Sequence, residues 1–110
     1  MLAKPTTGET LFIYLAVSEV TVSSVLIKEE RSTQRAVYYV SKSMTNPETR
    51  YPKIEKLALC LIVTARKLRP YFQSHPITVL TDQPLRQVLQ KPKLAGRLTR
   101  WAMELSEFDI

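Results

Sequence analysis

Three residue types are scarce in this chain, and each shortage argues against a class of structure. The single cysteine, Cys60, rules out an internal disulfide, and the single histidine, His75, argues against a zinc site. Two glycines stand against seven prolines, which favours rigid turns over flexible linkers. No run of about 18 apolar residues occurs, so a membrane-spanning helix is not expected.

Positive charge is what the chain has in excess. Sixteen lysines and arginines outweigh ten acidic residues, which gives a net charge of +6. A small basic domain favours polyanionic partners such as nucleic acid. Residues 1–5 are too short and too soon broken by proline for a signal peptide, so we expect a cytoplasmic or nuclear protein. With 110 residues and 45% hydrophobic content, the chain fits one folded domain.

The first part of the chain reads as three strands with short connections. Residues 10–17 are bulky and apolar on both faces, which is typical of a central strand. Residues 20–27 and 36–40 are rich in β-branched and aromatic residues. A turn at 18–19 and a charged hairpin loop at 28–32 would join the three strands in an antiparallel meander.

The hydrophobic period then changes to that of a helix. Apolar residues recur at helical spacing from Ile54 to Leu68, and the opposite side is apolar too, which predicts a central helix covered on both sides. The prolines at 47 and 52 mark its entry, and Pro70 marks its end.

After this helix, a fourth strand is predicted at 77–81, and a strand that follows a helical crossover is expected to run parallel to an earlier one. A short helix at 85–89, a linker at 91–93 and a helix at 94–105 follow. In the last helix the apolar stripe is predicted to face the core, with Arg97, Arg100 and Glu104 on the other side. Residues 108–110 read as the opening of a fifth strand. The predicted class is an α/β fold with a mixed sheet.

This order of elements, together with particular segments, resembles the RNase H-like domain of reverse transcriptases from gypsy-class LTR retrotransposons, especially those of plants. The matching segments are 8–18 (GETLFIYLAVS), 39–43 (YVSKS), 48–56 (ETRYPKIEK), 66–72 (RKLRPYF), 79–85 (VLTDQPL) and 101–110 (WAMELSEFDI). The resemblance implies an RNase H-like fold with a truncated fifth strand. It also implies a lead-in from the polymerase side at 1–9, a C-terminally incomplete domain at 10–110, and a place in a retroelement particle.

Members of this family that cut RNA use clustered carboxylates to hold two magnesium ions, which activate a water and stabilise the leaving oxygen. The resemblance places the helix carboxylate at Glu55 and the carboxylate after the fourth strand at Asp82. The first-strand position falls on Ala16, which has no ligand atom, and the fourth carboxylate would lie beyond Ile110. Glu19 lies an odd number of residues from Ala16, so we discount it as a replacement.

Each surviving acid also has an ordinary structural reading. Glu55 would sit in the first turn of a helix, where the helix dipole favours a negative charge. Asp82, in the sequence Thr-Asp-Gln-Pro, suits a turn or a helix N-cap. Both are therefore weak candidates as catalytic residues and as magnesium ligands.

A run of basic residues in the second half of the chain could contact the phosphates of an RNA–DNA hybrid, or could simply form a solvated face. These residues are Arg66, Lys67, Arg69, Arg86, Lys91, Lys93, Arg97 and Arg100. Trp101 lies in an apolar stripe, which favours core packing over base stacking. Cys60 is expected to be a small buried hydrophobe, and His75 has no partner evident in the sequence.

The leading hypothesis is a non-catalytic, tether-like module of a reverse transcriptase. It would support RNA–DNA template–primer binding, pack against the polymerase subdomains, and need no cofactor. One alternative is an active magnesium-dependent ribonuclease H. The other is a structural or oligomerising module that does not bind nucleic acid. The sequence leaves the oligomeric state open.

Overall fold

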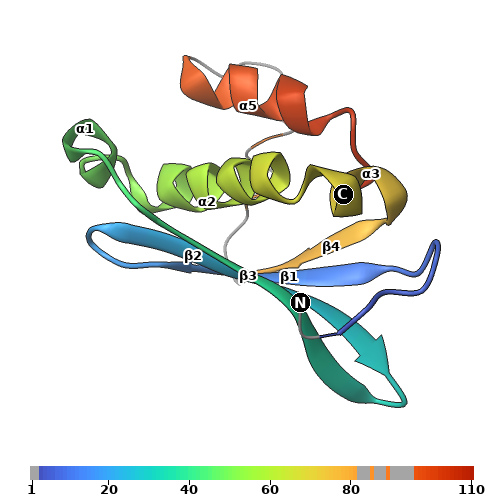
Figure 1. The fold of residues 1–110 in the computed structure, drawn as a ribbon. Coiled ribbons are helices and arrows are strands. Elements are labelled where there is room, and N and C mark those ends of the chain that lie inside the picture. Colours follow the sequence, from blue (N-terminus) through green and yellow to red (C-terminus); the bar gives the residue numbers. More distant parts are fainter. Residues whose placement is uncertain (1–2, 82–84, 86–88, 90–95) are drawn as a thin grey trace.

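A computed structural model describes residues 3–81, 85, 89 and 96–110 of the chain. Figure 1 shows a sheet with the described helices gathered on one of its faces. The elements are β1 (Leu11–Val17), β2 (Thr21–Glu30), β3 (Thr33–Ser43), α1 (Asn46–Thr49), α2 (Lys53–Lys67), α3 (Arg69–Ser74), β4 (Ile77–Leu80) and α5 (Arg97–Leu105).

The sheet has the predicted mixed topology. Its strand order is β3-β2-β1-β4, which places β1 at the centre. The β1–β2 and β2–β3 pairs are antiparallel, and β4 runs parallel to β1. The parallel pairing follows from the crossover, because the chain leaves β3, passes through α2 and returns to the same sheet.

The prediction of a charged loop at 28–32 is wrong, because most of this segment is strand. β2 continues through Glu30 and β3 begins at Thr33, so the turn consists of Arg31 and Ser32 alone. Both turn residues have positive φ, 52° and 66°, the left-handed backbone that a tight two-residue hairpin requires. Charged side chains had suggested a loop, but the edge of this sheet accommodates them within paired strands.

Helix α2 is buried on both sides, as its apolar pattern predicted. All nine residues from Leu57 to Ala65 are buried, with the sheet on one side and α5 on the other (Figure 1). The one hydroxyl among them, on Thr64, donates to the Cys60 carbonyl at 2.7 Å and lies 2.7 Å from the Ser24 hydroxyl of β2. This polar pair therefore fixes α2 against the sheet without leaving a buried group unsatisfied.

The C-terminal residues, which come after α5, contact the start of β4 but do not form a strand. Residues 106–110 contain no strand, yet the backbone N–H of Ile77 donates to the carbonyl of Asp109 at 2.8 Å. The chain end thus lies beside the first residue of β4, but the fifth strand expected to open at 108–110 is not formed. Most of the helix expected at 85–89, and the linker at 91–93, lie outside the described residues.

Candidate nucleic-acid interface and candidate acidic site

Glu55 lies in the first turn of α2, where the sequence placed it, and its carboxylate is occupied by an arginine. Arg97 of α5 donates from Nη1 to Glu55 Oε1 at 2.6 Å. The Glu55 side chain is only 18% exposed. This hydrogen bond to a carboxylate raises the pKa of Arg97 from its ordinary value. The candidate metal ligand therefore has an internal cationic partner.

The other mapped positions do not complete an acidic cluster among the described residues. Ala16 is exposed, and its neighbours Leu15 and Val17 pack against the core under α2, so the Ala16 methyl group points to the opposite face of the sheet. Asp82 lies outside the described residues. In the part of the chain that the structure describes, no group of three His, Cys, Asp or Glu residues could hold a metal ion. The described residues do not fit a two-metal site.

Three of the predicted phosphate-binding arginines form ion pairs inside the protein. Arg97 holds Glu55, as described above. Arg66 donates two hydrogen bonds, each 2.8 Å long, to the Glu104 carboxylate, and this raises the Arg66 pKa and lowers that of Glu104. Arg69 lies 2.9 Å from Glu107.

These ion pairs correct the expectation that Arg97 and Glu104 face solvent on the outer side of the last helix. The two residues are seven apart on α5, which places them on one side of the helix. Their partners, Glu55 and Arg66, are eleven apart on α2 and share a side in the same way. Helix α5 therefore runs parallel to α2, with ion pairs along the contact between them.

Arg100 and Lys67 remain exposed, and neither forms an ion pair with another described residue. Among the described residues, they are the two predicted phosphate ligands whose charge is not neutralised by an ion pair. Arg86, Lys91 and Lys93 lie outside the described residues.

A second group of exposed cations was missed at the sequence level. Lys42 is the second-last residue of β3, Arg50 follows α1, and Lys53 begins α2, so all three lie along the stretch of chain that leads from the sheet to the central helix. None of them pairs with an acid in the part of the chain that the structure describes. Their sequence signal was the concentration of lysine and arginine between 42 and 53, with Glu48 as the single acid.

The face of the sheet opposite the helices is apolar and largely without charge. Tyr14, Val25 and Tyr39 are paired across the three antiparallel strands and form a row, with Tyr14 38% and Tyr39 63% exposed. The adjacent row contains Ile27, which is buried yet does not belong to the main core cluster. Two rows cross all four strands, Leu80–Tyr14–Val25–Tyr39 and Thr78–Phe12–Ile27–Ala36, and a third, Ala16–Ser23–Ser41, crosses the antiparallel strands. The one charged strand residue on this face is Glu29, which pairs with Gln34 next to the β2–β3 hairpin.

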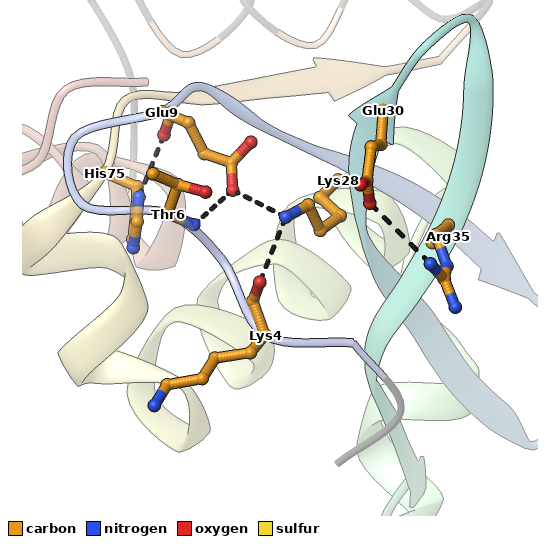
Figure 2. A network of polar contacts seen from close by, with 7 residues as sticks. All are labelled: Lys4, Thr6, Glu9, Lys28, Glu30, Arg35 and His75. Atoms are coloured by element: carbon orange, nitrogen blue, oxygen red, sulfur yellow. Dashed lines mark hydrogen bonds and ion pairs between the residues drawn. The ribbon is translucent and has the colours of Figure 1, made fainter.

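His75 has a partner that the sequence could not reveal. Its Nδ1 lies 2.9 Å from the carbonyl oxygen of Glu9, and Figure 2 shows the surrounding network. The Glu9 carboxylate accepts from the backbone N–H of Thr6 and pairs with Lys28 Nζ at 3.2 Å, and Lys28 also donates to the Lys4 carbonyl at 3.0 Å. The hydrogen bond from Thr6 is the main cause of the lowered pKa of Glu9. This network binds residues 4–9 to β2 and to the end of α3.

Two further expectations are confirmed. Cys60 is 1% exposed, and burial raises its pKa to about 11, so the thiol stays protonated and is no nucleophile. Trp101 is half-buried against the core, with its ring centroid 6.3 Å from that of Tyr51. No helix among the described residues is long and apolar enough to cross a membrane.

The sheet order and the central helix define the RNase H-like fold, and solved structures agree. A structure of a foamy viral protease–reverse transcriptase in complex with dsDNA is similar over 99% of this chain and 24% of that chain, with a TM-score of 0.66 and 26% identity. A second foamy viral structure, described as protease–reverse transcriptase dRH in complex with ds DNA, gives a TM-score of 0.60 over 88% of this chain and 18% of that chain. At 20% identity, it supports the fold alone.

The family itself is shown by sequence. A family model described as the RNase H-like domain found in reverse transcriptase matches residues 6–108, and the chain belongs to this family. Two curated relatives come from Drosophila melanogaster. The retrovirus-related Pol polyprotein from transposon opus is 31% identical over 90 residues, or 80% of this chain and 9% of the polyprotein. The retrovirus-related Pol polyprotein from transposon 297 is 27% identical over 75 residues, which are 67% of this chain and 7% of that polyprotein. The chain thus spans less than a tenth of either relative.

Proposed function

We propose that this domain is a non-catalytic module of a retrotransposon reverse transcriptase that supports the placement of an RNA–DNA template–primer. The observation that carries the proposal is the pairing of Glu55 with Arg97. Two-metal cleavage needs several carboxylates converging on the ions. The Ala16 side chain supplies no ligand atom, and the Glu55 carboxylate is engaged by an arginine, so two-metal chemistry lacks its ligands among the described residues.

The nucleic-acid role rests on the exposed cations. Lys67 and Arg100 from the predicted set, and Lys42, Arg50 and Lys53 from the missed set, are exposed and unpaired among the described residues. Cations of this kind bind phosphates without reading sequence. The foamy viral protease–reverse transcriptase that is 26% identical to this chain is in a complex with dsDNA, which favours a nucleic-acid role for this chain as well.

The polymerase subdomains of the same polyprotein are the partner we propose for the open sheet face. Apart from Glu29 next to the β2–β3 hairpin, the strand positions on this face carry no charged residue, in a chain that is 24% charged, so the face does not suit a phosphate backbone. Exposed tyrosines beside aliphatic residues are typical of the centre of a protein interface. More than nine tenths of each curated relative lies outside the matched region and could supply such a partner.

We also propose an element class, a location and domain bounds for this chain. The segments that resemble plant elements favour the gypsy class and a retroelement particle, in the cytoplasm or nucleus, as the setting. Residues 1–9 would be the lead-in from the polymerase side and 10–110 the domain, which would need no metal cofactor of its own.

The test is binding of the purified chain to an RNA–DNA hybrid, followed by fluorescence anisotropy across a range of salt concentrations. We expect weak, sequence-independent binding whose affinity falls steeply with salt. Lys67→Ala and Arg100→Ala should each weaken binding. Affinity that is the same at low and high salt would contradict the proposal. No binding at all would also contradict it and would favour a structural or oligomerising module.

A further inference from the structure

Helix α5 is attached to the start of α2 by a compact group of four side chains. Arg97 bonds to Glu55, and its guanidinium carbon lies 4.0 Å from the centroid of the Tyr51 ring. One turn further along α5, Trp101 packs its ring against the same tyrosine. Tyr51 and Glu55, around the start of α2, thus meet Arg97 and Trp101 of α5.

We propose that Arg97 is a built-in counter-cation that takes the place of a metal ion at Glu55 and turns this position into the anchor of α5. This inference rests on the proposed non-catalytic function and adds to it. In this proposal the Glu55 carboxylate holds α5 in place. The domain would then complete its helical layer at this site with no divalent cation.

The chemistry of the group fits an arginine better than a metal. A carboxylate needs a positive partner when it is only 18% exposed, and a planar guanidinium supplies hydrogen bonds to it while stacking on an aromatic ring. A magnesium ion would need further oxygen ligands in near-octahedral order. Among the described residues, no group of three or more His, Cys, Asp or Glu residues could hold such an ion.

Neighbouring residues separate this anchor from a general surface effect. Arg100 lies on the same helix, is exposed and has no acidic partner among the described residues, so it is the matched control for Arg97. Arg66 and Glu104 form a separate ion pair further along α2 and α5, and it should be unaffected by changes at Glu55.

The experiment measures the melting temperature of the whole chain for four variants, each in EDTA and in millimolar Mg²⁺. The variants are Glu55→Gln, Arg97→Met, the double variant and the control Arg100→Met. We expect Glu55→Gln to lower the melting temperature by about 4 °C. Arg97→Met should also lower the melting temperature. The melting temperature of the double variant should fall no further than that of the less stable single variant. The control Arg100→Met should melt at the same temperature as the wild type. Mg²⁺ should shift none of them.

Two results would overturn the inference. One is a rise in wild-type melting temperature with Mg²⁺ that disappears in Glu55→Gln, because Glu55 would then be a metal ligand. The other is full additivity of the two single changes, because Glu55 and Arg97 would then act independently. Cleavage of an RNA–DNA hybrid by the wild type would instead contradict the proposed non-catalytic function. The anchor is tested separately, by whether the melting-temperature changes of Glu55→Gln and Arg97→Met are additive in the double variant.

Discussion

Arg66 and Glu104 join the central helix to the last helix through two parallel hydrogen bonds of 2.8 Å each. A two-pronged contact of this kind is more specific than a single charge pair. It uses a cation that the sequence had offered as a phosphate ligand. The pairing therefore separates the basic residues into those that fasten helices and those left free to meet a polyanion.

This separation predicts different outcomes for neighbouring substitutions. Lys67→Ala should reduce the slope of log affinity against log salt by about 1, because one phosphate contact is lost. Arg66→Ala should change this slope less and should lower the melting temperature instead. Hybrid binding at several salt concentrations and thermal unfolding, measured on both variants, check the prediction. Equal slopes for the two variants would contradict it.

The hydroxyl pair between the sheet and α2 gives a second prediction. Thr64 donates to the Cys60 carbonyl, so Ser24 must donate to Thr64. In Thr64→Val the buried Ser24 hydroxyl loses its acceptor, which should cost about 1–3 kcal/mol in free energy of unfolding.

Urea denaturation of the single variant and of Ser24→Ala/Thr64→Val is the measurement for this pair. The double variant should recover part of the loss, because no buried hydroxyl is then left unsatisfied. A double variant less stable than Thr64→Val would argue against the pairing.

Cys60 should resist thiol reagents in the folded protein. Burial raises its pKa to about 11, so the reactive thiolate is rare at pH 8, and the sulfur also donates to the Ser23 carbonyl at 3.0 Å. We expect slow labelling by a thiol-disulfide reagent under native conditions and rapid labelling in denaturant. Rapid labelling of the native chain would show that α2 is exposed more often than its burial implies.

Stability should decline on the acid side for a defined reason. The pKa values of Glu9 and Glu104 are lowered from 4.5, by the hydrogen bonds from Thr6 and Arg66 respectively. The unfolded chain therefore takes up protons before the folded chain does, and the stabilisation from these groups is present above pH 4.5 and lost as the pH falls below it.

Melting temperatures measured from pH 7 down to pH 3 check this expectation. Glu104→Gln should flatten part of the decline, since the variant has no carboxylate to protonate at this position. An unchanged acid profile in this variant would count against the contribution of the Arg66 pair.

Much of the fold could be predicted because its elements depend on local patterns. The apolar segment of β1, the helical period of α2 and the crossover to a parallel β4 are each encoded in a short stretch of sequence. The length of the β2–β3 hairpin was not predicted, because the charged residues Lys28, Glu29 and Glu30 are typical of solvent-exposed loops. Only the tertiary structure shows Lys28 buried beside Glu9.

The candidate site was less predictable, for a related reason. The sequence placed Glu55 in the first turn of a helix, and the structure agrees. It could not show that Arg97, 42 residues away, would reach this carboxylate, because the contact depends on how α5 packs on α2. The partner of His75, 66 residues distant, was hidden in the same way. The roles of individual cations likewise become clear only when their acidic partners are in place.

The most direct test of the central claim is a magnesium titration of the purified chain with an RNA–DNA hybrid, in which binding and cleavage are followed together. We expect salt-sensitive binding with no cleavage at any magnesium concentration. Magnesium-dependent cleavage by pure protein, abolished in Asp82→Asn, would contradict it and identify the domain as a working ribonuclease H.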